Sequence, residues 1–272
     1  SESIGGEAHD EIKSHAFSFK DNLTGKDLSI RPDISEQASR IDAYRIQSNE
    51  VVKLCYAGEV VKSKVSKSLR SRTTIQVGAE IFGDSSKEAE LESINLMLKS
   101  LELAGIKNIT LSLGHAAFTS SVLEPFKKLG REIFVDLEIA LSRKSKSDLD
   151  KIIPDSNQNK QSLISLCDMY GGIDIIQSAK ENFSHFQTTK NFMDDLEGLA
   201  GKLINNSGIT LHIDLGEVQG FKYHNGVVFS AYADSAGYVL AKGGRYDGLR
   251  KQSDRDRPAV GFDLDLVSVS NL

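Results

Sequence analysis

Hydrophobic and polar residues alternate through much of residues 209–249, which is the pattern of β-strands with one buried face. The clearest run is 209–213, and two further β-rich runs cover 227–232 and 238–240. The last run leads into 242–248, where the sequence is KGGRYDG. Glycines here permit positive φ or a close approach to a bound molecule, so the segment is predicted to be either the wall of a small-molecule pocket or a hairpin turn.

Near the N-terminus, alternating residues predict short strands at 17–19 and 28–30. A proline follows the second strand and ends it, because proline has no backbone N–H to donate. Ser35 is then expected to cap a helix over 36–43. This places Asp33 and Ser35 at a strand-to-helix corner, where side chains often face a cleft.

Two longer strands are predicted at 51–61 and 74–82, separated by the basic, serine-rich segment 62–72. That segment is expected to be a long loop, whose charges either hold a phosphate or are simply solvated. In the second strand, Gln76 and Glu80 share one face with a glycine between them. This face has room for a polar ligand, and the alternative is a solvent-facing strand surface.

A helix is predicted over 86–104, because apolar residues recur there at spacings of three and four. A strand at 109–113 follows, and a last core strand is expected at 257–262 with a short helix behind it. Residues 117–205 show no strong strand pattern and are predicted to form several helices. We therefore expect a helical insertion between two halves of one sheet.

The composition narrows the possible functions. A hydrophobic content of 39% is enough for a sizeable core. The net charge of −5 argues against nonspecific nucleic-acid binding through an overall positive electrostatic potential. Cys55 and Cys167 lie far apart without metal-ligand spacing, so neither a disulfide framework nor a zinc site is expected. No membrane span, secretory signal or phosphate-binding glycine loop is present, and we expect a cytoplasmic protein without a cofactor.

Several short motifs occur in a fixed order along the chain. They are Ile30–Arg31–Pro32–Asp33, Tyr56–Ala57–Gly58, Arg70–Ser71–Arg72 with 76–83, Gly243–Gly244–Arg245–Tyr246–Asp247–Gly248–Leu249, and Pro258–Ala259–Val260–Gly261–Phe262. The series resembles the catalytic core of class II histidyl-tRNA synthetases from the second motif of that family to the third, over nearly the whole chain. The resemblance implies an α+β fold, with a class II aminoacyl-tRNA synthetase-like antiparallel sheet flanked by helices and a helical insertion at about 117–205. It further implies one synthetase-like domain over 1–272, without the family's first motif or C-terminal domain.

The departures from the synthetase pattern concern positive charge. Lys62 and Lys64 stand where the synthetases carry Arg-x-Glu, whose arginine grips the ATP α-phosphate. Gln219 and Ser268 stand where the synthetases carry two further arginines, one acting in adenylation and one stacking on adenine. Lysine lacks the bidentate fork of arginine, and glutamine and serine carry no charge. We therefore predict that the chain does not activate an amino acid.

The runs Cys55–Val60 and Ile75–Gly83 are similar to the non-catalytic synthetase paralogues that serve as regulatory subunits of short-form ATP phosphoribosyltransferase. The resemblance implies assembly with the catalytic subunit, a self-dimer within a hetero-octamer, and a response to histidine. It also implies a histidine-like pocket. In that pocket the α-amino end would be held by Asp33, Ser35, Gln76 and Glu80, and the imidazole side would be lined by Tyr223, His224, Gly244, Arg245 and Tyr246. The alternatives are an active histidyl-tRNA synthetase or another synthetase-like protein that binds histidine or tRNA, and the low basicity argues against tRNA.

Overall fold

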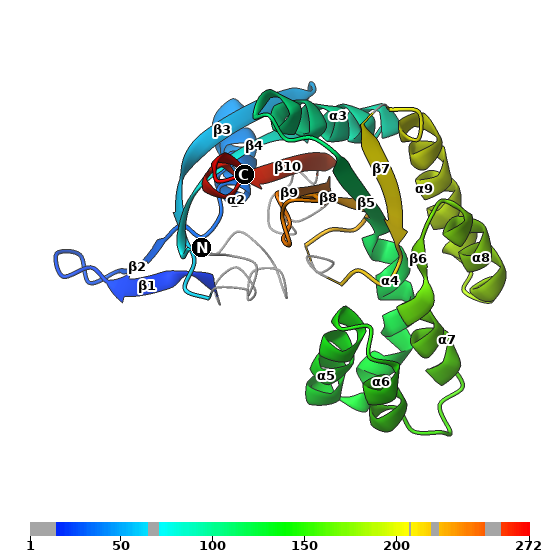
Figure 1. Cartoon of the computed structure of the whole chain (residues 1–272). Helices are drawn as coiled ribbons and strands as arrows, with labels where there is room; N and C mark the ends of the chain where they lie inside the picture. The colour runs from blue at the N-terminus through cyan, green and yellow to red at the C-terminus, as the bar shows by residue number, and fades with distance from the viewer. Residues whose placement is uncertain (1–14, 65–70, 207, 219–222, 248–256) are drawn as a thin grey trace. The chain divides into compact units, whose positions relative to one another are not determined.

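The chain forms two compact units, and the second is inserted into the first along the sequence (Figure 1). The first unit comprises Ser1–Ile109 and Ser230–Leu272, and the second comprises Thr110–Phe229. The computed structural model describes residues 15–64, 71–206, 208–218, 223–247 and 257–272. Among the described residues, no helix has both the length and the apolar character that a membrane crossing requires.

The first unit is built on an antiparallel sheet with a helix on one face. In hydrogen-bonded order, its strands are β3 (Val52–Val61), β4 (Thr73–Phe82), β10 (Ala259–Asp265), β9 (Ala241–Arg245) and β8 (Val227–Ala233), the last beginning in the second unit. Helices α2 (Ser35–Ile41), η1 (Asp42–Ile46), α3 (Lys87–Leu103) and α10 (Leu266–Ser270) complete this unit. Helix α3 buries an apolar stripe that includes Ile94, Met97 and Leu101, as its sequence periodicity predicts.

The second unit is mainly helical. Its elements in chain order are β5 (Ile109–His115), α4 (Ala116–Leu123), η2 (Glu124–Leu129), α5 (Arg131–Ser142), α6 (Lys146–Ile152), α7 (Lys160–Ser165), η3 (Leu166–Asp168), β6 (Tyr170–Gly171), α8 (Asp174–Asn182), α9 (Thr189–Leu203) and β7 (Ile209–Asp214). Between 117 and 205 the described elements are helical apart from the two-residue strand β6. The domain assignment made from the sequence stays a prediction.

A separate two-stranded hairpin lies near the N-terminus, where β1 (Phe17–Lys20) pairs with β2 (Asp27–Ile30) (Figure 1). The register puts four apolar side chains on one face and polar ones on the other. The apolar face consists of Phe17, Phe19, Leu28 and Ile30. Phe19 is 51% exposed, Leu28 44% and Ile30 41%, so this face remains open to solvent among the described residues.

Of the two alternatives for the glycine-marked segment 242–248, the hairpin turn is wrong for its described part. Residues 241–245 form β9, which lies between β10 and β8 in the sheet. The strand expected at 238–240 is absent, and those residues form bends and loop instead. Glycine disfavours strands when it is judged alone, but pairing on both sides of β9 outweighs that local preference here.

Ser35 also departs from the prediction. Helix α2 begins at Ser35, and the preceding residue, Ile34, provides no side-chain cap. The Ser35 hydroxyl lies 2.8 Å from the Tyr56 hydroxyl instead. A tertiary hydrogen bond has therefore replaced the local capping bond that the sequence suggests.

Two ion pairs join the sheet to α3, and both start from the same row of paired residues. Lys53 lies across from Ile81, which lies across from Val260 and then Arg245. Arg245 Nε is 2.5 Å from Glu90 Oε1, and both side chains are buried. Lys53 Nζ is 2.6 Å from Glu92 Oε1, and both side chains are at least half exposed. Because residues in one row point to the same face, α3 covers the face that carries Arg245.

This difference in burial predicts a difference in stability. Arg245→Ala leaves the Glu90 carboxylate buried without its cation, so we expect the free energy of unfolding to fall by about 3–5 kcal/mol. Lys53→Ala removes an exposed pair on the same helix, and its cost should stay under about 1 kcal/mol. Urea unfolding at pH 7 measures both variants. Equal costs would show that the buried pair does not anchor α3.

Candidate ligand-binding site

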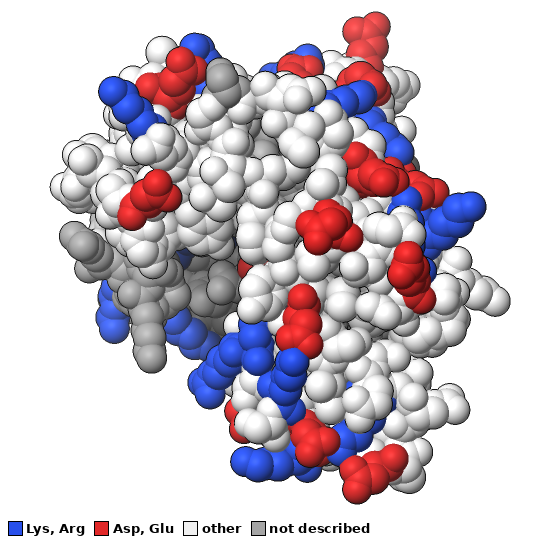
Figure 2. Space-filling view, turned by 45° about the vertical axis from the view of Figure 1, so that its right-hand side comes forward, with Lys and Arg blue, Asp and Glu red and all other residues white. Residues whose placement is uncertain are grey.

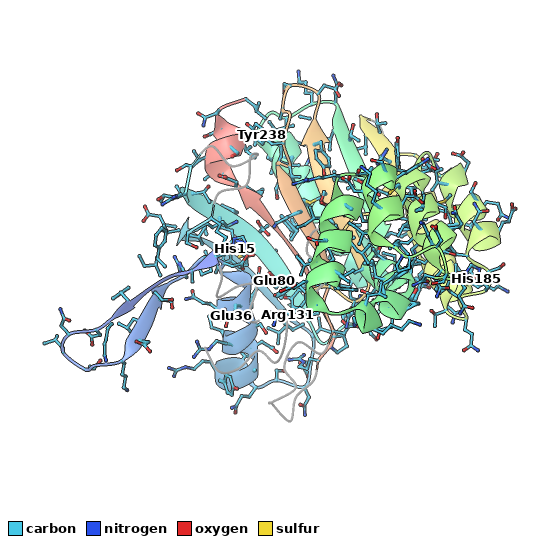
Figure 3. All side chains as sticks on the ribbon, turned by 90° about the horizontal axis from the view of Figure 1, so that it is seen from below. His15, Glu36, Glu80, Arg131, His185 and Tyr238 are labelled. Carbon is cyan, nitrogen blue, oxygen red and sulfur yellow. The ribbon has the colours of Figure 1, made fainter. Side chains whose placement is uncertain are left out.

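The face of the sheet opposite α3 carries polar side chains in its interior. Gln76 is 2% exposed and Glu80 is 1% exposed, so the solvent-facing alternative for this face of β4 is wrong. Helix α2 packs against β4. Glu80 of β4 and Glu36 of α2 are labelled in Figure 3 to locate these two elements. We call the described side chains Asp33, Ser35, Tyr56, Gln76, Glu80, Tyr246 and Asp263 the polar pocket.

The Glu80 carboxyl lies at the centre of the polar pocket. Tyr246 Oη donates to Glu80 Oε2 at 2.5 Å, and Tyr56 Oη donates to Glu80 Oε1 at 3.3 Å. Ser35 Oγ lies 2.8 Å from Tyr56 Oη and extends the chain of hydroxyls. Two tyrosines from different parts of the sequence thus fix one buried carboxyl group.

The strand-to-helix corner at Asp33 is held by the amide of Gln76. Gln76 Nε2 donates to Asp33 Oδ2 at 3.2 Å, and the Ile34 backbone N–H donates to Gln76 Oε1 at 2.8 Å. Ser35 N–H donates to Asp33 Oδ1 at 2.7 Å. The four residues expected to bind the α-amino end of a ligand, Asp33, Ser35, Gln76 and Glu80, therefore lie in one cluster. Their role as ligand contacts stays a prediction.

Glycines make space for the polar side chains. A Cβ atom on Gly261 would lie 1.7 Å from Glu80 Oε2, so the Glu80 carboxyl occupies the place of that side chain. A Cβ atom on Gly78 would lie 2.5 Å from Tyr56 Oη and 2.4 Å from the Phe262 carbonyl oxygen. Gly244 pairs with Gly261 in the same row. Gly78 and Gly261 thus leave room for the Tyr56 and Glu80 side chains.

The electrostatics of the polar pocket follow from burial. Burial raises the pKa of Glu80 to about 8, the charges of Asp33 and Asp263 add to the rise, and hydrogen bonds from Tyr246 and Ser35 oppose it. Burial also raises the pKa of Asp263 and that of Tyr56. Glu80 is therefore largely protonated at neutral pH. An ammonium group beside it would favour the carboxylate.

Arg245 does not contribute to the polar pocket in the way expected. Its guanidinium donates to Glu90 Oε1, and also to the carbonyl oxygens of Asp84 at 3.1 Å and Ser86 at 2.9 Å. Arg245 and Tyr246 are consecutive residues at the end of a strand, and they point to opposite faces. Tyr246 therefore reaches Glu80, while Arg245 holds the start of α3.

The other predicted site residues have separate placements. Tyr223 and His224 belong to the second unit, with ring centroids 5.2 Å apart, and their part in the pocket stays a prediction. Gln219 lies outside the described residues.

Two of the remaining positions lie at the end of β3. The Lys62 N–H donates to the Arg72 carbonyl oxygen at 2.8 Å, just beyond that strand, and Lys64 is exposed. Ser268 lies in α10, where its hydroxyl donates to Asp265 Oδ2 at 2.9 Å. All three therefore lie outside the strands of the sheet.

Sequence reasoning did not include Tyr56 and Asp263 among the site residues. Tyr56 pairs with Gly78 across β3 and β4, and Gly78 pairs with Asp263 across β4 and β10. Tyr56 stood in a motif that we singled out, and Asp263 directly follows another. Only the strand order shows that they lie on the same face of the sheet. Among the described residues, no group of His, Cys, Asp or Glu side chains is placed to hold a metal ion.

The chain matches known proteins over almost its whole length. A family model described as histidyl-tRNA synthetase matches residues 1–269. Two proteins named ATP phosphoribosyltransferase regulatory subunit are each 35% identical to the chain. The one from Ralstonia pickettii aligns over 270 residues, 99% of this chain and 68% of that protein. The one from Burkholderia cenocepacia aligns over 263 residues, 96% of this chain and 68% of that protein.

Solved structures agree with the sequence matches. A structure described as an ATP phosphoribosyltransferase regulatory subunit/histidyl-tRNA synthetase from Bacillus halodurans has a TM-score of 0.81 at 25% identity, over 95% of this chain and 68% of that one. The ATP phosphoribosyl transferase complex from Thermotoga maritima has a TM-score of 0.68 at 17% identity, over 98% of this chain and 87% of that one, and shows the fold alone.

The fold and the pocket thus define a class II synthetase-like protein, which confirms the fold class predicted from the sequence. Within that class, the chain belongs to the family of ATP phosphoribosyltransferase regulatory subunits.

The raised pKa of Glu80 predicts how stability depends on pH. The folded chain binds this proton more tightly than the unfolded chain, so stability falls as pH rises from the ordinary value of 4.5 towards 8. The contribution is about 3 kcal/mol between pH 5 and pH 7.5, at 1.36 kcal/mol per pKa unit. We expect Glu80→Gln to remove this slope, because glutamine does not titrate. Urea unfolding across the pH range measures it.

The control for this experiment is Glu59→Gln, on the exposed side of the neighbouring strand β3. It should keep the pH dependence of the unmodified chain. Parallel curves for Glu80→Gln and the unmodified chain would contradict the assignment of Glu80 as the titrating group.

Proposed function

We propose that the chain is a non-catalytic regulatory subunit that assembles with the catalytic subunit of short-form ATP phosphoribosyltransferase, at the first step of histidine biosynthesis. The observation that carries this proposal is its membership of the regulatory-subunit family at 35% identity over nearly the whole chain. The polar pocket supplies a place where a ligand such as histidine can be recognised. The lost positive charges explain why recognition is not followed by chemistry.

The argument against catalysis rests on the positions that differ from the synthetase pattern. Lys64 reverses the charge of the glutamate in Arg-x-Glu, and Lys62 replaces its arginine. The Ser268 hydroxyl is bound to Asp265 and brings no charge. Adenylation develops negative charge on phosphate in the transition state, and stabilising that charge is usually the largest catalytic contribution. We infer that histidine is bound and not activated.

The polar pocket favours a ligand with an ammonium group. Asp33 offers acceptor oxygens, and Glu80 becomes a carboxylate acceptor when an ammonium group beside it lowers its pKa. Tyr246 fixes the Glu80 carboxyl through a 2.5 Å hydrogen bond. Occupancy regulates the enzyme only if one quaternary state binds the ligand more tightly than another. The proposed role of the pocket is therefore to couple histidine binding to the state of the assembly.

The amphipathic β1–β2 hairpin supports assembly. An isolated two-stranded hairpin is marginally stable in water, and exposed apolar patches commonly mark protein interaction sites. Phe19 and Leu28, opposite each other on the apolar face, are 51% and 44% exposed. We propose that subunit association, including a self-dimer within a hetero-octamer, covers this face.

The alternative is a histidyl-tRNA synthetase or a related protein that binds tRNA, and the match to the synthetase family model favours testing it. A tRNA surface needs a concentration of positive charge. On the face shown in Figure 2, Lys and Arg side chains are interspersed with Asp and Glu side chains among the described residues. The net charge of −5 also argues against a tRNA-binding surface.

Assembly with the catalytic subunit can be tested directly. The chain should capture the catalytic phosphoribosyltransferase subunit in a pull-down and change its activity, with sedimentation reporting the size of the complex. Phe19→Ser with Leu28→Ser should weaken association at least about tenfold, because both side chains lose apolar contact area. Ser29→Ala changes the polar face of the same hairpin and serves as the control. Absence of capture together with unchanged catalytic activity would contradict the proposal.

Histidine binding can be tested separately from assembly. Histidine should bind the chain or its complex in calorimetry, and Glu80→Gln should weaken binding at least about tenfold, because a neutral amide cannot pair with an ammonium. Glu59→Gln should bind like the unmodified chain. Histidine-dependent ATP–pyrophosphate exchange should be undetectable. The pocket assignment fails if neither the chain nor the complex responds to histidine, and the non-catalytic assignment fails if exchange is observed.

A further inference from the structure

A third carboxyl group, that of Asp263, lies on the ligand-facing side of the sheet. Asp263 is half-buried on β10, where it pairs with Gly78 of β4. The hydroxyl of Tyr56 occupies the space above Gly78. Gly261 lies two residues before Asp263 on β10, so it is on the same face of the sheet. The Glu80 carboxyl lies above Gly261. Asp263 therefore stands next to the central carboxyl of the polar pocket.

Asp263 also lies directly across from a cation. On its other side β10 pairs with β9, and the register places Lys242 opposite Asp263. Residues opposite each other in an antiparallel pair share a face, with Cβ atoms roughly 5 Å apart. Burial raises the pKa of Asp263, and the charge of Asp33 adds to the rise. The charges of Lys242 and Lys62 and a hydrogen bond from Gln76 oppose it.

This arrangement bears on which ligands can enter. Lys242 lies on the pocket face opposite Asp263, where its ammonium group could pair with a phosphate. The Asp263 carboxylate would neutralise part of that positive charge. A phosphate placed there would also lie near Asp33, whose charge acts on Asp263, and like charges repel strongly at partly buried sites.

We propose that Asp263 is a specificity-determining residue, an internal counter-ion for Lys242 that excludes phosphorylated ligands from the polar pocket and leaves it to cationic amines. The inference rests on the proposed function only in taking the polar pocket as the ligand site. A carboxylate at this position would let the same face of the sheet accept hydrogen bonds from an ammonium group and repel the phosphates of a nucleotide. Removing the carboxylate should therefore create phosphate affinity rather than abolish binding.

The test uses inorganic pyrophosphate as the probe, measured by calorimetry on the full chain. We expect Asp263→Asn to bind pyrophosphate at least about tenfold more tightly than the unmodified chain, because Lys242 loses its internal partner. Adding Lys242→Ala to that variant should reverse the gain. Asp234→Asn, an exposed residue of the same unit, changes the net charge equally and should leave pyrophosphate binding unchanged.

The outcomes separate this inference from the proposed function. If Asp263→Asn is folded by circular dichroism and binds pyrophosphate no better than the unmodified chain, the counter-ion role is wrong. A gain that persists with Lys242→Ala also overturns it. Asp263→Ser provides the same comparison if the asparagine variant does not fold. A histidine titration of the unmodified chain runs in parallel, and its failure counts against the histidine pocket without affecting the pyrophosphate result.

Discussion

The polar pocket depends on a carboxyl group, that of Glu80, held inside the sheet rather than at its surface. Burying such a group is costly unless it finds hydrogen-bond partners or loses its charge. Here Tyr246 and Tyr56 donate to its two oxygens, and burial raises its pKa to about 8. Space for it exists only because Gly261 has no side chain. The buried Glu80 carboxyl thus constrains the residue type at Tyr56, Tyr246 and Gly261.

The glycine-rich motif 243–249 contributes side chains to both faces of the sheet. Arg245 reaches α3 and pairs with the buried Glu90, while Tyr246 reaches Glu80 on the opposite face. Because strand side chains alternate, neighbouring residues of a motif can serve the fold and the pocket separately. The position of a residue within a recognised motif therefore does not show whether it contacts a ligand. The register of its strand decides that.

Much of this arrangement could be predicted from local sequence. The period of two placed Gln76 and Glu80 on one face, and the proline-marked turn placed Asp33 and Ser35 at a corner. Both groups occur in the polar pocket. The hairpin strands at 17–19 and 28–30 and the helix at 86–104 are confirmed as β1, β2 and α3.

The rest depended on contacts between distant segments. Strand β9 is rich in glycine and becomes a strand because it is paired on both sides. Ser35 bonds Tyr56, a residue 21 positions away, in place of capping its own helix. The membership of Asp263 in the polar pocket follows from the order β3-β4-β10-β9, which no local pattern contains. Local propensity therefore located the elements, whereas tertiary pairing assigned their side chains.

Two of the positions that depart from the synthetase pattern lie outside the strands. Lys62 follows the last residue of β3, and Ser268 lies in α10, beyond the end of β10. Gln76 and Glu80 of the polar pocket instead stand inside β4, where the Glu80 carboxyl is packed over Gly261. Changing Glu80 or Gly261 forces repacking of the sheet, whereas changing Lys62 alters charge without opening a buried cavity. The packing requirements of the sheet therefore constrain Glu80 and Gly261 more tightly than they constrain Lys62 and Ser268.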